Sequence, residues 1–344
     1  MVLVVGYASL SNNFRHNLDM KSSRIVVTNP IHKDVLDRLE QFGQVIMNPS
    51  IDPWSQQELT KHLTSATAMM GFMTDCVDKA LLQNAPDLKI IACALKGFDS
   101  YDVNACTNQN VWVSIVPDLL TEPTAELAIG LAISLGRFMR HGDDLVRSQS
   151  FTGWRAQLFG KGLNNSTVCI LGLGLVGQSI AKRLFGFGCK SILGVDPTKS
   201  VTGVIPTSLE HALTVSDYLF VAIPLTDNTF NLLSYEQFSL SKKGQLVINV
   251  GRGSVVNESA VADAIEKGDI GGYAADVFAF EDWGLHNRPN KIDIRLLEQS
   301  NTVFTPHLGS AVKAVRLAIE HRAADNIIAV LNGHPPPDAV NVIP

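Results

Sequence analysis

Three polar residues in the last third of the chain have types that together could move a proton beside a bound anion. They are Arg252, Glu281 and His307. An arginine offers a planar fork of donors to an oxyanion and keeps its charge, and a histidine exchanges a proton near neutral pH. A glutamate hydrogen-bonded to the far ring nitrogen would hold the histidine tautomer and raise its basicity. Taken alone, each residue is more simply interpreted as a surface charge or a hydrogen-bonded loop residue.

The three residues share a position, because each follows an apolar segment with the pattern of a buried strand. The pairs are Leu246–Asn249 before Arg252, Gly272–Val277 before Glu281 and Thr302–Phe304 before His307. In an open parallel sheet the loops after the strands line the ligand crevice. We therefore expect the three side chains to converge and to act as one catalytic set.

A dinucleotide motif lies upstream of this set. The apolar strand Val168–Leu171 runs into a turn with the pattern GxGxxG, formed by Gly172, Gly174 and Gly177, and a helix is expected to follow up to Phe185. The next strand, Ile192–Val195, ends in Asp196 at the spacing of a ribose-binding acid. A carboxylate there favours NAD over NADP, although the nearby Lys199 leaves partial use of NADP open.

The elements that would position these residues alternate between strands and helices, which predicts parallel sheets covered on both faces. In the first half, strands are expected at Ile25–Thr28, Gln44–Met47, Ala68–Phe72 and Lys89–Leu95, and helices at His32–Phe42, Ser55–Ser65 and Lys79–Asn84. In the second half, further strands are expected at Tyr218–Ile223 and in the segments named above, with long helices at Thr124–Arg140 and Ser310–Leu331. Ser55 and Glu58 match a capping box.

This order predicts an α/β protein of two doubly wound parallel-sheet domains. Residues 119–308 are expected to form a Rossmann-type NAD-binding domain, and residues 21–118 with 309–344 a discontinuous, flavodoxin-like substrate domain. Residues 1–20 are expected to be an extension outside both. The apolar helix Thr124–Arg140 would cross between domains or form a homodimer contact.

Composition narrows the class of protein further. The formal net charge of −5 and the lack of a basic stripe argue against nucleic-acid binding, and no apolar run is long enough to span a bilayer. The five cysteines form no CxxC pair, which favours reduced thiols in a cytoplasmic protein. No metal site is predicted.

With these motifs the chain resembles the D-2-hydroxyacid dehydrogenase family over nearly its whole length after about residue 24. The resemblance is carried by Gly172–Gly177, Asn249–Ser254, Asp276–Glu281 and Thr305–Ser310. It implies Arg252, Glu281 and His307 as the catalytic residues, in the family's chain order. The pairing of histidine with glutamate also differs from the formate dehydrogenases, which have a glutamine there.

Four further stretches resemble the phosphonate dehydrogenases, a branch of this family that oxidises phosphite to phosphate with NAD. They are Cys93–Asp99, Val116–Thr121, Gly272–Trp283 and Ser310–Glu320. The resemblance implies a phosphite site made by Lys96, Gly97, Met73, Arg252 and Arg316. It implies a cofactor site that adds the catalytic His307 and a set of lining residues to the glycines and Asp196, and that shares Lys96 and Arg252 with the phosphite site. The lining residues are Thr124, Leu175, Val176, Ala222, Ile223, Pro224, Val250, Gly251 and Asp276.

Two other functions remain open from the sequence. An NAD-dependent dehydrogenase of a small D-2-hydroxy acid, such as glycerate, would need the same Arg252, Glu281 and His307 but not Lys96. A non-enzymatic, NAD-responsive regulator could share the fold, although an intact catalytic set argues against it. Lys96 is therefore the residue that distinguishes phosphite from a hydroxy acid, because a lysine ammonium suits a compact polyanion.

Overall fold

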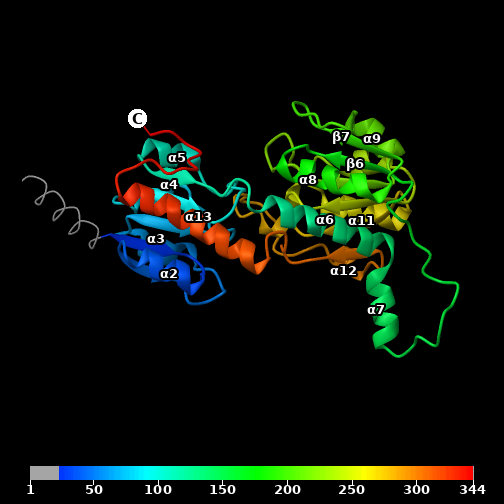
Figure 1. Cartoon of the computed structure of the whole chain (residues 1–344), viewed down its shortest axis with the longest axis horizontal. Helices are drawn as coiled ribbons and strands as arrows, with labels where there is room; N and C mark the ends of the chain where they lie inside the picture. The colour runs from blue at the N-terminus through cyan, green and yellow to red at the C-terminus, as the bar shows by residue number, and fades with distance from the viewer. Residues whose placement is uncertain (1–22, 344) are drawn as a thin grey trace, which may run out of the picture. The chain divides into compact units, whose positions relative to one another are not determined.

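The computed structural model describes residues 23–343, so the predicted N-terminal extension lies outside the described residues. The chain divides into two compact units (Figure 1). Unit 1 ends at Leu120 and resumes at Lys313, and unit 2 comprises Thr121–Val312. The boundaries expected from the sequence, 118/119 and 308/309, fall close to these positions.

Unit 1 is built on a five-stranded parallel sheet in the order β2-β1-β3-β4-β5, the order of flavodoxin-like folds. Its strands are β1 (Arg24–Val27), β2 (Gln44–Met47), β3 (Ala68–Gly71), β4 (Ile90–Cys93) and β5 (Trp112–Ser114). Its helices are α2 (Lys33–Leu39), α3 (Gln56–Leu63), α4 (Lys79–Gln83), α5 (Val103–Asn108) and α13 (Lys313–Leu331). The predicted capping box at Ser55 and Glu58 is present at the start of α3.

The sheet of unit 1 is buried on both faces, as its unbroken apolar strands require. One face packs against α2 and α13, with Ile319, Ala323 and Ile327 of α13 fully or almost fully buried. The other face packs against α3, α4 and α5. The chain segment that returns from unit 2 thus completes the core of unit 1.

Unit 2 has a seven-stranded parallel sheet in the order β12-β11-β10-β9-β6-β7-β8, which extends the doubly wound order of nucleotide-binding folds by one strand. Its strands are β6 (Thr167–Leu171), β7 (Ser191–Val195), β8 (Ile205–Pro206), β9 (Tyr218–Val221), β10 (Gln245–Asn249), β11 (Ile270–Ala275) and β12 (Thr302–Phe304). Helices α6 (Thr121–Gly136) and α8 (Leu175–Leu184) pack on one face. The other face is covered by α9 (Leu209–Val215), α10 (Tyr235–Ser239), α11 (Glu258–Lys267) and α12 (Ile294–Glu298). The predicted fold class of two parallel-sheet α/β domains is therefore confirmed.

One predicted element is wrong in its extent. The helix expected at Thr124–Arg140 is two helices, α6, which ends at Gly136, and α7 (Met139–Arg147). A side chain at Gly136 would collide with the Tyr218 hydroxyl, and Phe138 adopts a left-handed conformation with φ of 51°. α6 is also buried against the sheet of its own unit, so its apolar residues are explained without a partner.

The sequence pattern did not reveal several short elements. They are β5, β8, α5, α7 and α9 to α12. Short elements carry too few residues for a clear period, so packing against the sheet decides them. Within residues 23–343, no helix combines the length and the apolar character needed to cross a bilayer.

Candidate active site

The turn between β6 and α8 in unit 2 has the shape of a pyrophosphate cradle. Gly172 has φ of +95°, which only glycine adopts readily. A side chain at Gly177 would collide with the Gly172 carbonyl oxygen, whereas a Cβ at Gly174 would meet no atom within 4 Å. The first and third glycines therefore permit the turn and the close helix, and the second leaves space at the N-terminus of α8, where backbone N–H groups favour a phosphate.

Asp196 lies beside this turn, directly after β7. Its Oδ2 accepts a hydrogen bond from the Leu173 backbone N–H at 2.8 Å, and its Oδ1 accepts from the N–H groups of Thr198 and Lys199 at 2.9 Å each. Burial acts to raise the pKa of Asp196, but these donors outweigh it and hold the pKa below its ordinary value. The carboxylate is thus ionised at neutral pH at the position expected for a ribose-binding acid.

Other residues predicted to line the cofactor meet at the same edge of the sheet. A Cβ on Gly172 would touch the Ala222 carbonyl oxygen and the Ile223 side chain, and a Cβ on Gly251 would lie 2.6 Å from the Ile223 carbonyl oxygen. The turns after β6, β9 and β10 are therefore in contact. The remaining residues predicted to line the cofactor lie in or next to these turns. Leu175 and Val176 are in the first turn of α8, Pro224 follows Ile223, and Val250 follows β10.

His307 and Glu281, two of the predicted catalytic residues, are in contact with each other. His307 Nδ1 lies 2.8 Å from Glu281 Oε2, and the two side chains are 29% and 22% exposed. Glu281 Oε1 also accepts a hydrogen bond from the Phe278 backbone N–H at 2.9 Å. Because both carboxylate oxygens are engaged, Glu281 holds the imidazole with Nδ1 toward the protein and leaves Nε2 for a substrate.

The loop that carries His307 is held by Asp276, which follows β11. The nearly fully buried carboxylate of Asp276 accepts hydrogen bonds from Thr305 Oγ1 at 2.7 Å, from the Leu308 N–H at 2.6 Å and from the Gly309 N–H at 2.8 Å. His307 itself has φ of 56°, an unusual conformation for a residue other than glycine. Burial raises the pKa of Asp276 despite these donors. The predicted cofactor residue Thr124 is also near, since a Cβ on Gly309 would lie 2.9 Å from its hydroxyl.

Arg252 lies three residues after β10 and is half-buried. Asn249 Nδ2 donates to the Arg252 carbonyl oxygen at 2.9 Å, and Arg252 Nη1 donates to the Gly251 carbonyl oxygen at 2.9 Å. These two hydrogen bonds fix the Arg252 loop and side chain at the carboxyl edge of the sheet, where His307 and Glu281 also lie.

Two acidic residues that support this set were missed by sequence reasoning. Asp282 Oδ2 accepts from the Ser254 N–H at 2.7 Å, and Glu258 Oε1 accepts from the Ala279 N–H at 2.8 Å. These bonds tie the Arg252 and Glu281 loops together and to α11. Glu258 is mostly buried, which raises the pKa of its carboxyl. The sequence around Asp282 and Glu258 did not indicate this supporting role, because their hydrogen-bond partners lie in distant segments of the chain.

The substrate residues predicted in unit 1 lie at the carboxyl end of its own sheet. Met73 follows β3, and Lys96 and Gly97 follow β4, all three half-buried. Arg316, near the start of α13, donates from Nη1 to the Ala94 carbonyl oxygen at 3.4 Å, and its guanidinium carbon lies 5.8 Å from the centre of the Phe72 ring. Burial lowers the pKa of Arg316, and Glu320 opposes that shift. Unit 1 thus brings two cations, Lys96 and Arg316, to one edge.

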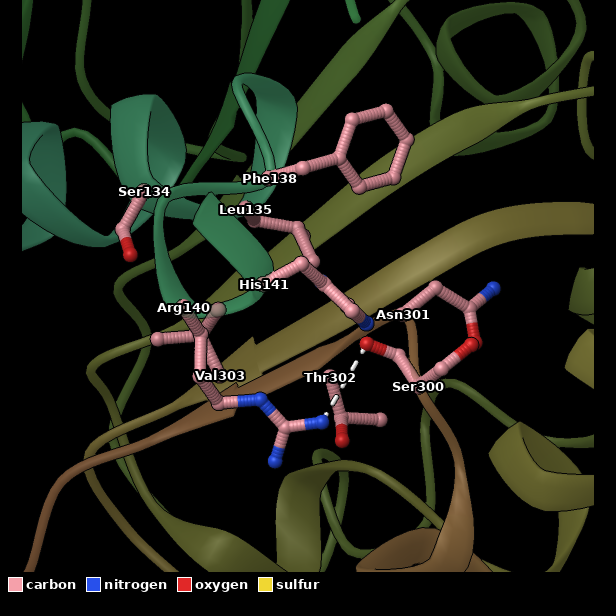
Figure 2. Close-up of a pocket in the computed structure, with 9 residues that line it drawn as sticks. All are labelled: Ser134, Leu135, Phe138, Arg140, His141, Ser300, Asn301, Thr302 and Val303. Atoms are coloured by element: carbon pink, nitrogen blue, oxygen red, sulfur yellow. Dashed lines mark hydrogen bonds between the residues drawn. The ribbon is translucent and has the colours of Figure 1, made fainter. Parts of the chain in front are cut away.

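A small pocket elsewhere in unit 2 does not belong to this site. Figure 2 shows Arg140 and His141 beside Ser300 and Asn301, with Arg140 hydrogen-bonded to the Ser300 carbonyl oxygen at 3.3 Å. The pocket lies where β12 begins, whereas His307 follows the opposite end of that strand.

Known proteins resemble this chain over most of its length. A family model described as D-isomer specific 2-hydroxyacid dehydrogenase, NAD binding domain, matches residues 129–309. A glyoxylate reductase of Thermococcus litoralis is 33% identical over 92% of this chain and 96% of its own length. Glyoxylate/hydroxypyruvate reductase B of Serratia proteamaculans is 32% identical over 94% of this chain and 98% of its own length.

Solved structures are similar across both units. The TT0316 protein of Thermus thermophilus has a TM-score of 0.85 and 30% identity, covering 92% of this chain and 100% of that one. An NADPH-dependent glyoxylate/hydroxypyruvate reductase of Sinorhizobium meliloti, solved with citrate, has a TM-score of 0.80 and 28% identity, covering 92% of this chain and 97% of that one.

Proposed function

This chain belongs to the D-isomer specific 2-hydroxyacid dehydrogenase family, and from that premise we propose that it interconverts a small 2-oxo acid and its 2-hydroxy acid with a nicotinamide cofactor. The substrate class is that of glyoxylate and hydroxypyruvate, for which its relatives are named. The single observation that carries the proposal is the hydrogen bond of 2.8 Å between His307 Nδ1 and Glu281 Oε2, at the same sheet edge as Arg252.

Each residue of the set has a defined task in this reaction. When bound, the nicotinamide supplies or accepts the hydride. His307 gives a proton from Nε2 to the carbonyl oxygen of the 2-oxo acid, and takes it back in the reverse direction. Glu281 holds His307 in the required tautomer and stabilises the imidazolium form. Arg252 orients the substrate's oxygens and offsets the negative charge that develops on the carbonyl oxygen.

For the cofactor, unit 2 carries the NAD-binding domain of the family. The fit rests on the open space at Gly174 and on the ionised Asp196 beside it. We propose a preference for NAD, because a carboxylate at Asp196 repels a ribose 2′-phosphate. Some solved relatives are NADPH-dependent by name, and Lys199 next to Asp196 would soften that repulsion.

A second candidate substrate is phosphite, which is favoured by Lys96 and Arg316 at one edge of unit 1. Phosphite carries nearly two negative charges at neutral pH, and two cations suit a compact dianion. The reaction would convert phosphite, water and NAD⁺ into phosphate, NADH and a proton, with His307 orienting or deprotonating the attacking water. The relatives named above are reductases of glyoxylate or hydroxypyruvate, which reverses the order of the two substrates expected from the sequence.

One comparison distinguishes the two substrates. We expect oxidation of NADH with glyoxylate or hydroxypyruvate to have a much higher kcat/KM than reduction of NAD with phosphite. The reverse ratio would overturn the main proposal in favour of phosphite. Absence of turnover with both substrate classes would contradict both and leave the regulator interpretation.

Lys96→Ala tests the second candidate directly. If phosphite is the substrate, the variant should raise KM for phosphite by roughly tenfold to a hundredfold, since a charge-assisted contact to a buried anion contributes about 1.5–3 kcal/mol. Lys89→Ala is the matched control, because Lys89 is exposed and precedes the other end of β4. Unchanged phosphite kinetics in Lys96→Ala would exclude a substrate role for this lysine.

A further inference from the structure

A buried carboxylate in unit 1 lies next to the predicted substrate residues but belongs to none of the roles above. Asp75 is 6% exposed and lies two residues after Met73, in the segment that joins β3 to α4. Carboxylates are almost never buried unless they make specific polar contacts. The partners of Asp75 therefore indicate what it holds in place.

The contacts of Asp75 close the turn that carries Met73. The Asp75 backbone N–H donates to the Phe72 carbonyl oxygen at 3.2 Å, and Asp75 Oδ2 accepts from the Phe72 backbone N–H at 2.7 Å. The turn Phe72–Asp75 is thus closed twice, once by the backbone and once by the side chain. The Tyr101 hydroxyl also donates to the Phe72 carbonyl oxygen, at 2.9 Å.

The same carboxylate also ties this turn to the neighbouring strand. Thr28, which directly follows β1 and is 1% exposed, donates from Oγ1 to Asp75 Oδ2 at 2.5 Å. β1 and β3 are paired in parallel, with Val27 opposite Met70. Asp75 therefore joins the carboxyl ends of two adjacent strands at the edge where Met73 lies.

The Phe72–Asp75 turn also supports Arg316. The Phe72 ring, at the first position of the turn, lies 5.8 Å from the Arg316 guanidinium carbon, a distance at which an arginine is attracted to an aromatic face. Arg316 is further held by the Ala94 carbonyl oxygen. The position of the Phe72 ring is set by the turn, and the turn is closed by Asp75.

We propose that Asp75 is a positioning residue for substrate binding, which fixes the Phe72–Asp75 turn and through it the anion-binding geometry of Arg316 and Met73. This inference rests on the proposed function, since it assumes that the anionic substrate binds at these residues. It adds to that function a determinant of substrate affinity that does not itself touch the substrate.

The test compares Asp75→Ala with Asp102→Ala in the full chain. Asp102 is a matched control, because its side chain likewise accepts a backbone N–H, that of Ala105 at 2.9 Å, but caps α5 instead of the turn. We expect Asp75→Ala to raise KM for the anionic substrate about tenfold, with kcat and the KM for the cofactor changed less than about threefold, while Asp102→Ala changes none of the three.

Asp75→Asn guards against simple misfolding, because it keeps the shape of the side chain. We expect it to raise KM by a smaller factor than Asp75→Ala without a fall in Tm at neutral pH. Equal KM values in Asp75→Ala, Asp102→Ala and the wild type would overturn the proposal. A fall in kcat with unchanged KM would overturn it as well, because it would place Asp75 in the chemical step.

A second measurement separates this inference from the proposed function. In Asp75→Ala, backbone hydrogen exchange in the Phe72–Asp75 turn should accelerate, and the Tm increase produced by oxalate, used as a small dianion, should shrink. Asp102→Ala should match the wild type in both. If the wild type turns over no substrate, the proposed function fails, but hydrogen exchange and the oxalate-induced Tm shift still test the role of Asp75. If neither readout changes in Asp75→Ala, the inference is overturned even when the enzyme is active.

Discussion

At the scale of single residues, the surroundings of the His307 imidazole decide which ring nitrogen can exchange a proton with the substrate. Glu281 Oε2 engages His307 Nδ1, and Phe278 donates its N–H to the other oxygen of the same carboxylate. Asp276 holds the loop directly after the histidine through the backbone N–H groups of Leu308 and Gly309. The ring is thus oriented by two carboxylates, of which only one touches it, and Nε2 alone is left for the substrate.

We therefore expect His307→Ala to act on the chemical step. The variant should lower kcat by roughly 10²–10⁴-fold while changing KM little, because the anion-binding residues remain and the proton-handling group is lost. Glu281→Gln should lower kcat less, since an amide can still hydrogen-bond the ring. Steady-state kinetics with the preferred substrate measure both. A large increase in KM with unaltered kcat would show that His307 binds substrate instead of transferring a proton.

The environment of Asp75 makes the stability of the protein depend on pH. Burial raises the pKa of Asp75 from its ordinary 3.8 to about 6, although Thr28 and Phe72 donate hydrogen bonds that oppose the shift. The titratable groups that face it are the thiols of Cys76 and Cys93 and the Tyr101 hydroxyl. The folded chain therefore binds this proton more tightly than the unfolded chain does. Its contribution favours folding below about pH 4 and is lost as the pH rises through about 6.

The consequence can be measured in Asp75→Asn, whose side chain does not titrate. Relative to the wild type, the Tm of the variant should be higher at about pH 8 than at about pH 4.5. A shift of about two pKa units corresponds to roughly 3 kcal/mol in full, of which roughly 2 kcal/mol is lost between pH 4.5 and pH 8, and this amounts to a few degrees in Tm. Thermal unfolding at both pH values, read as a difference, cancels the effects of other groups. A difference that does not change with pH would contradict the prediction.

At the scale of elements, each of the three glycines in the β6–α8 turn is required for a different reason. Gly172 supplies a positive φ, Gly177 lets α8 approach the Gly172 carbonyl oxygen, and Gly174 borders space that the protein leaves open. Only the last of these concerns a ligand. The motif therefore combines two requirements of folding with one of binding, and substitution can separate them.

Gly174→Ala and Gly177→Ala form a matched pair for this purpose. The added Cβ at residue 174 meets no protein atom within 4 Å, so Gly174→Ala should keep the wild-type Tm and weaken NAD binding at least about tenfold by occupying ligand space. Gly177→Ala should lower Tm by several degrees, because its Cβ collides with backbone. Thermal unfolding and titration with NADH measure the two effects. Unchanged NADH affinity in Gly174→Ala would mean that the cofactor does not approach this turn.

At the scale of the whole molecule, the segment after α6 exposes several large apolar side chains. α7 has no buried residue and points away from the sheet of its unit in Figure 1. Met139 is 55% exposed, and in the segment that follows α7, Trp154 is 78% and Phe159 76% exposed. A run of the chain with several exposed large apolar side chains is a reason to expect an interaction surface there. The homodimer expected from the sequence is thus better assigned to this segment than to the buried α6.

We predict a homodimer that depends on residues 139–160. Sedimentation velocity at micromolar concentration should show a dimer for the wild type, and the double variant Trp154→Ser, Phe159→Ser should shift it toward monomer without lowering helix content. The matched control is Ile51→Ser, since Ile51 is 88% exposed but lies in unit 1. A wild type that sediments as a monomer would refute the prediction.

Much of this site could be predicted from the sequence, because it rests on local spacing and on the regular order of strands in a parallel sheet. The glycine turn and its strand and helix are local, and Asp196 follows the next strand, so spacing alone identifies them. Arg252, Glu281 and His307 follow three strands of one parallel sheet, whose carboxyl ends must meet at one edge. The capping box at Ser55 and Glu58 is local for the same reason. The alternation of elements was sufficient for the fold class.

Only the tertiary structure decided the features that depend on segments distant in sequence. Residue 136 must be glycine because the Tyr218 hydroxyl, from strand β9, leaves no room for a side chain there, and the chain breaks between α6 and α7 at the left-handed Phe138. Asp75 meets Thr28 across 47 residues, and Asp276 meets Gly309 across 33. Such contacts carry no local period or spacing, because they arise when β-strands far apart in the chain become neighbours in a sheet. In the sequence, an acid near a strand end is indistinguishable from a solvated charge, and only its burial reveals which turn it holds.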